Sequence, residues 1–389
     1  MYDLILLSTL TIPLLAVILA GRYFERGVLE ASLEELAQRR YRLSSMMSLA
    51  IVSQVLLMSV AFSLWIDRME APDWLLSQLE TVADVLIDTI DRPLTGAILS
   101  ITAMVVIVLY YSLYSLPWLR FDRIAKRAQG GALRRTQVRM TLRSTLAGLI
   151  PMALWFSLVN ALPQGFMNDP THLVLTLAGF ILLSHSLSPW QVQLANPTAL
   201  LPADHPVTQM AMALGRDAGV RIEAVCVITL GEMKIANAMV SGLWPRLRRI
   251  YVTDHMLATF SVAEIRAILA HEVGHLRHRH LWWYLGFALG GTLIIPRMIN
   301  ALDHLELLRH SVWGLLIAMG LYWGLMFKFL SRRFEREADR FAVAATGDIV
   351  IFQQALERLA DVNGTVKQYS KWDIFQTHPP IAERVKALG

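Results

Sequence analysis

Long apolar runs constrain this chain more than any other feature of its sequence. A helix needs about 17 to 25 apolar residues to cross the roughly 30 Å hydrocarbon core of a bilayer. We find about seven such windows, at residues 4–20, 43–66, 96–119, 144–162, 172–188, 281–301 and 312–330. The fifth window is the weakest, because it is short and ends in the polar sequence SHSLSPW. Hydrophobic residues make up 55% of the chain and charged residues only 17%, so the pattern predicts a predominantly α-helical polytopic membrane protein.

Basic residues between the windows predict how the spans are oriented. The first window is preceded by Asp3 and by no basic residue, which is not the pattern of a cleavable signal peptide. Residues 22–42 and 120–143 are rich in Lys and Arg, whereas residues 67–95 and 163–171 are not. Because basic loops lie on the cytoplasmic side, we expect an integral membrane protein with its N-terminus outside. The net charge of +5 then reflects membrane topology, and no nucleic-acid partner is expected.

The polar segments suggest how the rest of the chain is organised. We expect a transmembrane region of five spans (1–188), a cytoplasmic region (189–280), a two-span hairpin (281–330) and a cytoplasmic helical tail (331–389). In the cytoplasmic region, EAVCVITL and RRIYVTD alternate as short β-strands do, and NAMVSG between them is a third candidate strand. The following segment, SVAEIRAILAHEVGH, is typical of a helix. Ser261 and Glu264 at its start are spaced as a capping box.

That helix carries a pattern of metal-binding side chains. His271 and His275 are four residues apart, so both imidazoles lie on one face of the helix and can reach the same ion. Glu272 between them completes an HExxH pattern, in which a carboxylate takes a proton from a metal-bound water. The single cysteine, Cys226, excludes a Cys-rich zinc site, so a metal would be held by His and carboxylate. A bare HExxH is only moderately specific, and the extension HExxHxxGxxH is absent, since Leu281 stands where it requires His.

A catalytic zinc ion needs a third protein ligand, and the two-span hairpin suggests where to find it. The hairpin returns the chain to the membrane face where His271 lies, and the next segment is SRRFEREADRFA. Glu335 and Asp339 in this segment are four residues apart and face the same way on a helix. Glu335 is therefore a candidate ligand, and Asp339 could accept the free ring N–H of a ligating histidine. The alternative is a solvated helix face with i,i+4 charge pairs.

Together these motifs resemble the integral-membrane zinc metallopeptidases that include the type I CAAX prenyl endopeptidase and the HtpX-like proteases. The resemblance rests on HEVGH, two spans, SRRFEREAD and THPPIAERV, and extends from about residue 200 to the end. It implies a small α+β zinc protease domain of the gluzincin type that holds one zinc ion. Its implied zinc ligands are His271, His275 and Glu335, and its implied base is Glu272.

The resemblance also implies roles outside the zinc ligands. Asp339 would orient a ligand, and His378 and Arg384 would line the catalytic centre. NAMVSG, with Asn237 and Ala238, would be the edge strand on which an extended peptide is laid. Taken singly, Asn237 and His378 are equally consistent with structural turns, and Arg384 with a surface charge.

We therefore expect a membrane-embedded zinc endopeptidase that cuts peptides or membrane proteins near the cytoplasmic interface of a lipid bilayer. The bilayer would be the plasma membrane, or the inner membrane if the protein is bacterial. Both CAAX-peptidase-like processing and membrane-protein quality control stay open. The alternative is a non-proteolytic metal-binding scaffold or transporter, whose closed site would need a fourth ligand such as His278 or His378. We expect His278 and His280 to belong to a basic membrane-proximal collar.

Overall fold

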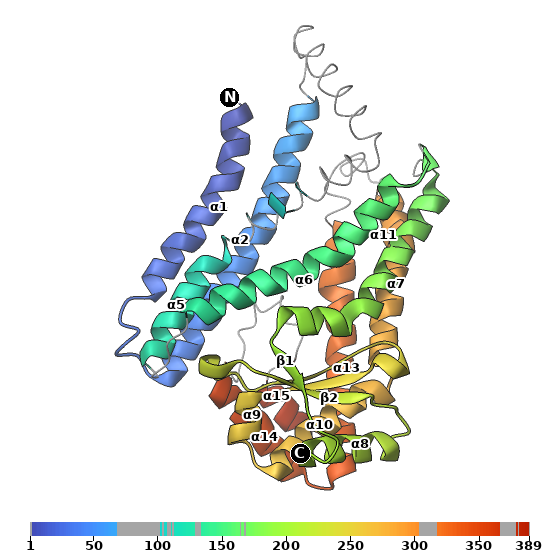
Figure 1. The fold of residues 1–389 in the computed structure, drawn as a ribbon. Helices are drawn as coiled ribbons and strands as arrows, with labels where there is room; N and C mark the ends of the chain where they lie inside the picture. The colour runs from blue at the N-terminus through green and yellow to red at the C-terminus, as the bar shows by residue number, and fades with distance from the viewer. Residues whose placement is uncertain are drawn as a thin grey trace.

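The chain is mostly helical, with one small mixed sheet. The computed structural model describes residues 2–67, 102, 105–106, 110, 113–128, 134–163, 165–166, 169–302, 317–365, 379 and 381–388. Long helices extend from one side of a compact region that contains the sheet, and the C-terminus lies in that compact region (Figure 1). The predicted combination of long helices with a small α+β region is therefore confirmed.

The first two helices form a pair at one edge of the molecule (Figure 1). These are α1 (Tyr2–Phe24) and α2 (Leu33–Asp67), and the amphipathic helix α5 (Ser115–Ala128) packs against both. Arg40 on α2 forms an ion pair with Asp122 on α5 (2.6 Å) and donates a hydrogen bond to the carbonyl of Asn363 (2.8 Å). The N-terminal helices are thus tied to the compact region.

Two helices among the described residues are long and apolar enough to cross a membrane. They are α6 (Arg134–Asn160) and α7 (Pro170–Ala195). The seven spans predicted from hydropathy are not confirmed. Helices α1, α2 and α11 (His280–Leu302) do coincide with predicted windows, but most of the window at 96–119 and the start of the last window lie outside the described residues. A window of apolar residues cannot by itself separate a span from an apolar helix that packs within the protein.

Helix α7 is longer than the weak window at 172–188 predicted. The helix continues through Pro189 to Ala195. Arg143 on α6 donates a hydrogen bond to a carbonyl in its last turn (2.7 Å), and the Tyr251 hydroxyl donates to the carbonyl of Pro189 (3.0 Å). These contacts from distant residues hold the polar end of the helix, which the apolar pattern does not reveal.

The sheet has four strands in the order β1-β2-β4-β3, so β3 forms one edge. The strands are β1 (Thr198–Leu200), β2 (Ala224–Ile228), β3 (Ala238–Ser241) and β4 (Arg249–Thr253). β2 and β4 are parallel, whereas the β1–β2 and β3–β4 pairs are antiparallel. The three predicted strands are found, and β1 was missed because its three residues are too few to show alternation.

Helices cover both faces of this sheet, as the alternation of its side chains requires. Val225 and Ile250 point toward α8 (Pro206–Asp217) and α10 (Val262–Arg277), in the main core of the compact region. Cys226 and Tyr251 point to the opposite face, where Val192 of α7 packs. The short 3₁₀ helices η2 (Gly231–Met233) and η3 (Pro245–Leu247) lie between successive strands, and the short helix α9 (Asp254–Thr259) lies between β4 and α10.

Helix α10 begins as predicted. The Ser261 hydroxyl accepts the backbone N–H of Glu264 (3.3 Å), and the Glu264 carboxylate accepts that of Ser261 (2.7 Å). Arg358 also donates to this carboxylate (2.9 Å), and so links α14 (Ile349–Asn363) to the start of α10. The capping box therefore defines where α10 starts and fixes one end of the helix that carries HEVGH.

The C-terminal helices pack beside α10. A π-helical segment, η4 (Gly320–Met326), continues directly into α13 (Phe327–Thr346), which contacts α10 along much of its length. Gly347 then ends α13 in a left-handed conformation (φ 71°), and α14 turns back across α10. The last helix, α15 (Ile381–Leu388), packs against α13 and α14.

Candidate active site

Helices α10 and α13 bring three potential metal ligands together. His271 and His275 come from α10 and Glu335 from α13. The Nε2 atoms of the two histidines are 3.2 Å apart, and each lies 3.6 to 3.7 Å from an oxygen of Glu335. Donors about 2.0–2.1 Å from a tetrahedral zinc ion are separated by about 3.3–3.4 Å. One donor atom from each side chain lies within 4.8 Å of the other two, so the three side chains are grouped closely enough to hold a zinc ion, and they fit that metal.

Asp339 and Arg384 lie behind the first of these histidines. Asp339 Oδ1 is 2.9 Å from Nδ1 of His271, and Arg384 donates to both Asp339 oxygens (2.6 and 2.9 Å). Burial works to raise the pKa of Asp339, but the hydrogen bonds from Arg384 and His271 outweigh it and hold that pKa below its usual value. The ionised carboxylate requires a proton on His271 Nδ1, which leaves Nε2 free to bind a metal.

Burial lowers the pKa of His275 to about 3, so its imidazole is neutral and can act as a ligand. The outer nitrogen of His275, Nδ1, lies 2.9 Å from Nδ1 of a further histidine, His280. The expectation that His280 belongs to a surface collar is not borne out, since only 1% of its side chain is exposed. Its neighbour His278 is exposed and forms the C-cap of α10.

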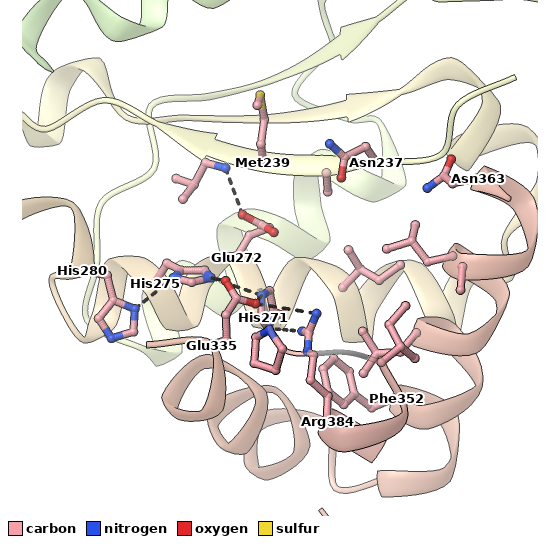
Figure 2. Close-up of a pocket in the computed structure, with 18 of the residues that line it drawn as sticks. Asn237, Met239, His271, Glu272, His275, His280, Glu335, Phe352, Asn363 and Arg384 are labelled. Carbon is pink, nitrogen blue, oxygen red and sulfur yellow. Dashed lines mark hydrogen bonds and ion pairs between the residues drawn. The ribbon is translucent and has the colours of Figure 1, made fainter. Parts of the chain in front are cut away.

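Glu272 points away from the ligands, toward the edge of the sheet (Figure 2). Its Oε2 accepts a hydrogen bond from the backbone N–H of Val240 on β3 (3.0 Å). Burial raises the pKa of Glu272 to about 7, and the charge of Glu335 contributes to that rise. A carboxyl group with this pKa can both accept and return a proton near neutral pH.

The free edge of β3 runs directly above α10 (Figure 2). Alternate residues of an edge strand direct their N–H and C=O groups away from the sheet. Val240 uses its N–H for Glu272, and Ala236 is bound through both its N–H and its C=O to the side-chain amide of Asn363 (2.9 and 2.7 Å). Ala238 lies between Ala236 and Val240, so its backbone N–H and C=O groups also point away from β4. The backbone of Asn237, in contrast, faces β4, since its carbonyl accepts the N–H of Thr253 (3.0 Å).

A cavity of about 500 Å³ connects these groups. One side of the cavity is formed by the potential metal ligands, by Glu272 and Arg384, and by Asn237 and Ala238 at the strand edge. Its apolar side comes mainly from α14, through Phe352, Leu356 and Leu359. The cavity therefore combines metal donors, a strand edge and an apolar wall, a combination suited to an extended peptide with apolar side chains.

The structure brings together most of the residues singled out from the sequence. Pairwise contacts link His271, His275, Glu335, Asp339 and Arg384, and Glu272, Ala238 and Asn237 border the same cavity. The reading of Arg384 as a surface charge is wrong, because its side chain is only 10% exposed. His378 lies outside the described residues. Asn363 was missed, because no local pattern connects it with Ala236, 127 residues away.

Gly274 allows α10 and α13 to approach closely at this site. A Cβ atom at this position would lie 3.1 Å from Cα and 3.2 Å from the carbonyl oxygen of Ala338. We expect Gly274→Ala to push the two helices apart by a few tenths of an ångström, with a loss of about 1–3 kcal/mol in unfolding free energy and weaker metal binding. Denaturant unfolding and metal titration would measure both effects. Gly286→Ala, where a Cβ meets nothing within 4 Å, is the matched control; equal behaviour of the two variants would contradict the prediction.

Comparison with known proteins defines the class to which this arrangement belongs. Residues 204–389 match the family model described as Peptidase family M48. The C-terminal part of the chain, which holds every group described above, is therefore a peptidase domain. This part of the chain is similar to peptidase family M48, and the resemblance noted from HEVGH and SRRFEREAD is confirmed.

Individual proteases extend the similarity beyond that domain. A "Protease HtpX homolog" of Thermoplasma acidophilum is 25% identical over 250 residues, which cover 60% of this chain and 78% of the relative. One from Aeropyrum pernix is 27% identical over 272 residues, with 56% and 84% covered. "Protease HtpX" of Pseudomonas putida is 24% identical over 241 residues, with 53% and 80% covered.

One solved structure resembles the whole chain. The crystal structure of S. mikatae Ste24p matches with a TM-score of 0.55 over 100% of this chain and 99% of that one, at 16% sequence identity. At this identity the match shows a shared fold. The likeness includes the N-terminal helices, which the family model does not cover.

Proposed function

We propose that this protein is a membrane-embedded, zinc-dependent endopeptidase that hydrolyses peptide bonds near the cytoplasmic membrane interface. The observation that carries the proposal is the grouping of three potential metal donors within 4.8 Å of one another, beside a buried carboxylate and the free edge of a strand. The similarity of residues 204–389 to peptidase family M48, a family of zinc metalloproteases, supports the same ion.

In this proposal His271, His275 and Glu335 hold one zinc ion. When bound, zinc lowers the pKa of a water molecule and polarises the carbonyl of the scissile bond. Asp339 and Arg384 keep His271 in the tautomer that binds metal. The three side chains line the cavity, so a zinc ion held by them would have room for water and substrate as a fourth ligand.

Glu272 is the proposed general base. It accepts the proton of the attacking water and passes it to the amine of the leaving peptide. The hydrogen bond from Val240 N–H orients its carboxylate toward the strand edge, where the substrate would lie. His378 remains our candidate for a hydrogen bond to the oxyanion, because its position in THPPIAERV resembles that of the family motif.

The edge of β3 is the proposed binding site for the substrate backbone. Ala238 lies on the edge strand of the sheet and offers backbone groups that an extended peptide can pair with. Two residues before Ala238, the backbone N–H and C=O of Ala236 are already hydrogen-bonded to the Asn363 side chain. A bound peptide therefore cannot pair with the strand edge at Ala236. The side chain of Asn237 borders the cavity and could contact the peptide from the side.

The position of β3 next to apolar helices supports cleavage close to the membrane. At its far end, Ser241 is hydrogen-bonded to Ser188 of α7 (3.0 Å), and Trp244 to Ser186 (3.0 Å). The strand β3 thus ends beside α7, one of the two candidate spans. With the basic loops inside, the N-terminus would lie outside and the catalytic face in the cytoplasm. Both short lipidated chain ends and damaged membrane proteins fit such a site.

The proposal is tested by removing the metal. We expect the purified protein to cleave an unfolded protein or a quenched fluorescent peptide and to lose most of that activity with 1,10-phenanthroline. Zinc, added after the chelator is removed, should restore the activity. An inhibitor of serine proteases is the control and should have no effect. Cleavage that persists in protein shown to be free of metal would contradict the proposal.

A further inference from the structure

His280 is a buried imidazole beside the metal ligands that the proposed mechanism does not use. Its Nδ1 lies 2.9 Å from Nδ1 of His275 (Figure 2). Its other nitrogen, Nε2, lies 3.1 Å from Oε2 of Glu337 on α13. His280 therefore connects the second metal ligand to a carboxylate that does not itself reach the metal.

The backbone and the packing around His280 hold it in this place. Helix α10 ends at Arg277, and Arg279 then adopts a left-handed conformation (φ 58°), which a residue with a side chain rarely takes. This turn starts α11 at His280 and brings its ring under His275. The ring also stacks on Phe334, with centroids 4.1 Å apart and planes at 10°. A strained residue and a stacked ring thus fix one orientation of the imidazole.

The hydrogen bonds determine which nitrogen atoms carry protons. Glu337 accepts hydrogen bonds from Arg333 Nε (2.8 Å) and from His280, so the proton of His280 is on Nε2. His280 Nδ1 is then an acceptor, and the proton shared between the two rings belongs to Nδ1 of His275. His275 is left with a lone pair on Nε2, the atom that faces His271 and Glu335.

We propose that His280 and Glu337 are positioning residues of the metal centre, which hold His275 in its metal-binding tautomer through a Glu337–His280–His275 relay. Asp339 acts directly on His271, whereas Glu337 acts on His275 through an interposed imidazole. Glu337 lies two residues from both Glu335 and Asp339, so its side chain points to another side of α13. It therefore acts on His275 through the ring of His280, which lies between them. The relay rests on the proposed function only in that the ion is taken to be zinc.

The relay predicts a change in metal affinity. Loss of an outer partner of a metal-bound histidine lowers affinity by about 10–100-fold. We expect that range for His280→Leu, which removes the acceptor for His275. In His280→Asn the side-chain oxygen can replace Nδ1 as acceptor, so this variant should keep an affinity within a few-fold of the wild type. Glu337→Leu should weaken binding less than His280→Leu does, because His280 remains but its Nε2–H loses the acceptor that fixes the tautomer.

Zinc dissociation constants of the full-length protein, from competition with a chromophoric chelator, would test these expectations. The matched control is Glu357→Gln, since this glutamate lies at an exposed position on α14 and its replacement should leave the affinity unchanged. Thermal unfolding of the metal-free proteins checks that each variant folds. The absorption spectrum of the cobalt-substituted protein should change in His280→Leu and stay similar in His280→Asn.

Wild-type affinity in a folded His280→Leu protein would overturn the relay. If that variant does not fold, Glu337→Leu decides, because Glu337 is partly exposed (27%) and its replacement leaves the core intact; unchanged affinity would then overturn the relay. A metal-binding wild type that cleaves no peptide would contradict the proposed function but not the relay, since affinity is measured without any substrate.

Discussion

Replacing Glu272 with Gln should lower kcat/KM by about 10²–10⁴-fold, the range typical of a general base, while zinc stays bound. The amide of Gln keeps the size of the side chain and can still accept the N–H of Val240. It cannot accept a proton from water. The three donor atoms of the site do not include Glu272, so the metal content should not change.

Peptide cleavage and metal content would be measured on the same preparation of this variant. Glu223→Gln is a suitable control, because Glu223 is an exposed glutamate in the same domain whose salt bridge with Arg221 lies on the surface. Its activity should equal that of the wild type. If Glu272→Gln cleaved at the wild-type rate, another group would have to be the base.

The core of the site could be predicted from the sequence because helical geometry determines it. His271 and His275 share a face through their spacing alone, and so do Glu335 and Asp339. The hydrophobic hairpin between the two helices suggested that they meet. The distances now observed, such as 2.9 Å between His271 Nδ1 and Asp339, agree with that arrangement.

The surroundings of the site depend on tertiary contacts and could not be predicted. The reading of His280 as part of an exposed collar followed from its basic neighbours, but its burial depends on the left-handed residue Arg279 and on Phe334, which is distant in sequence. Asn363 likewise meets Ala236 only through the return of α14. No sequence pattern within either segment predicts such a contact.

The membrane region was the least predictable part. Hydropathy located apolar windows, and helices occupy those of them that the structure describes, but only α6 and α7 among the described helices satisfy both length and apolar character. Helix α2 also extends beyond the window predicted at 43–66, because its first turns carry Arg39, Arg40 and Arg42, and Arg40 pairs with Asp122. Hydropathy alone does not show such a polar extension.

Replacing Glu335 with Gln should abolish metal binding and turnover together, in contrast to Glu272→Gln. Glu335 provides the only charged donor of the three ligands, and a neutral amide oxygen is a much weaker zinc ligand than a carboxylate. The loss of zinc affinity should exceed the roughly 10–100-fold expected for an outer partner. Arg384 Nη1, 3.6 Å from Glu335 Oε2, would also lose an opposing charge, which adds to the cost of holding a cation there.

A zinc titration of activity separates this variant from Glu272→Gln. Excess zinc should restore part of the cleavage by Glu335→Gln, because mass action can refill a weakened site, and should restore none in Glu272→Gln, where the site is already full. Glu357→Gln, an exposed position on α14, is the control and should titrate like the wild type. Full zinc affinity in Glu335→Gln would show that the carboxylate of α13 is not a ligand, and the third donor would then have to come from another side chain at the cavity.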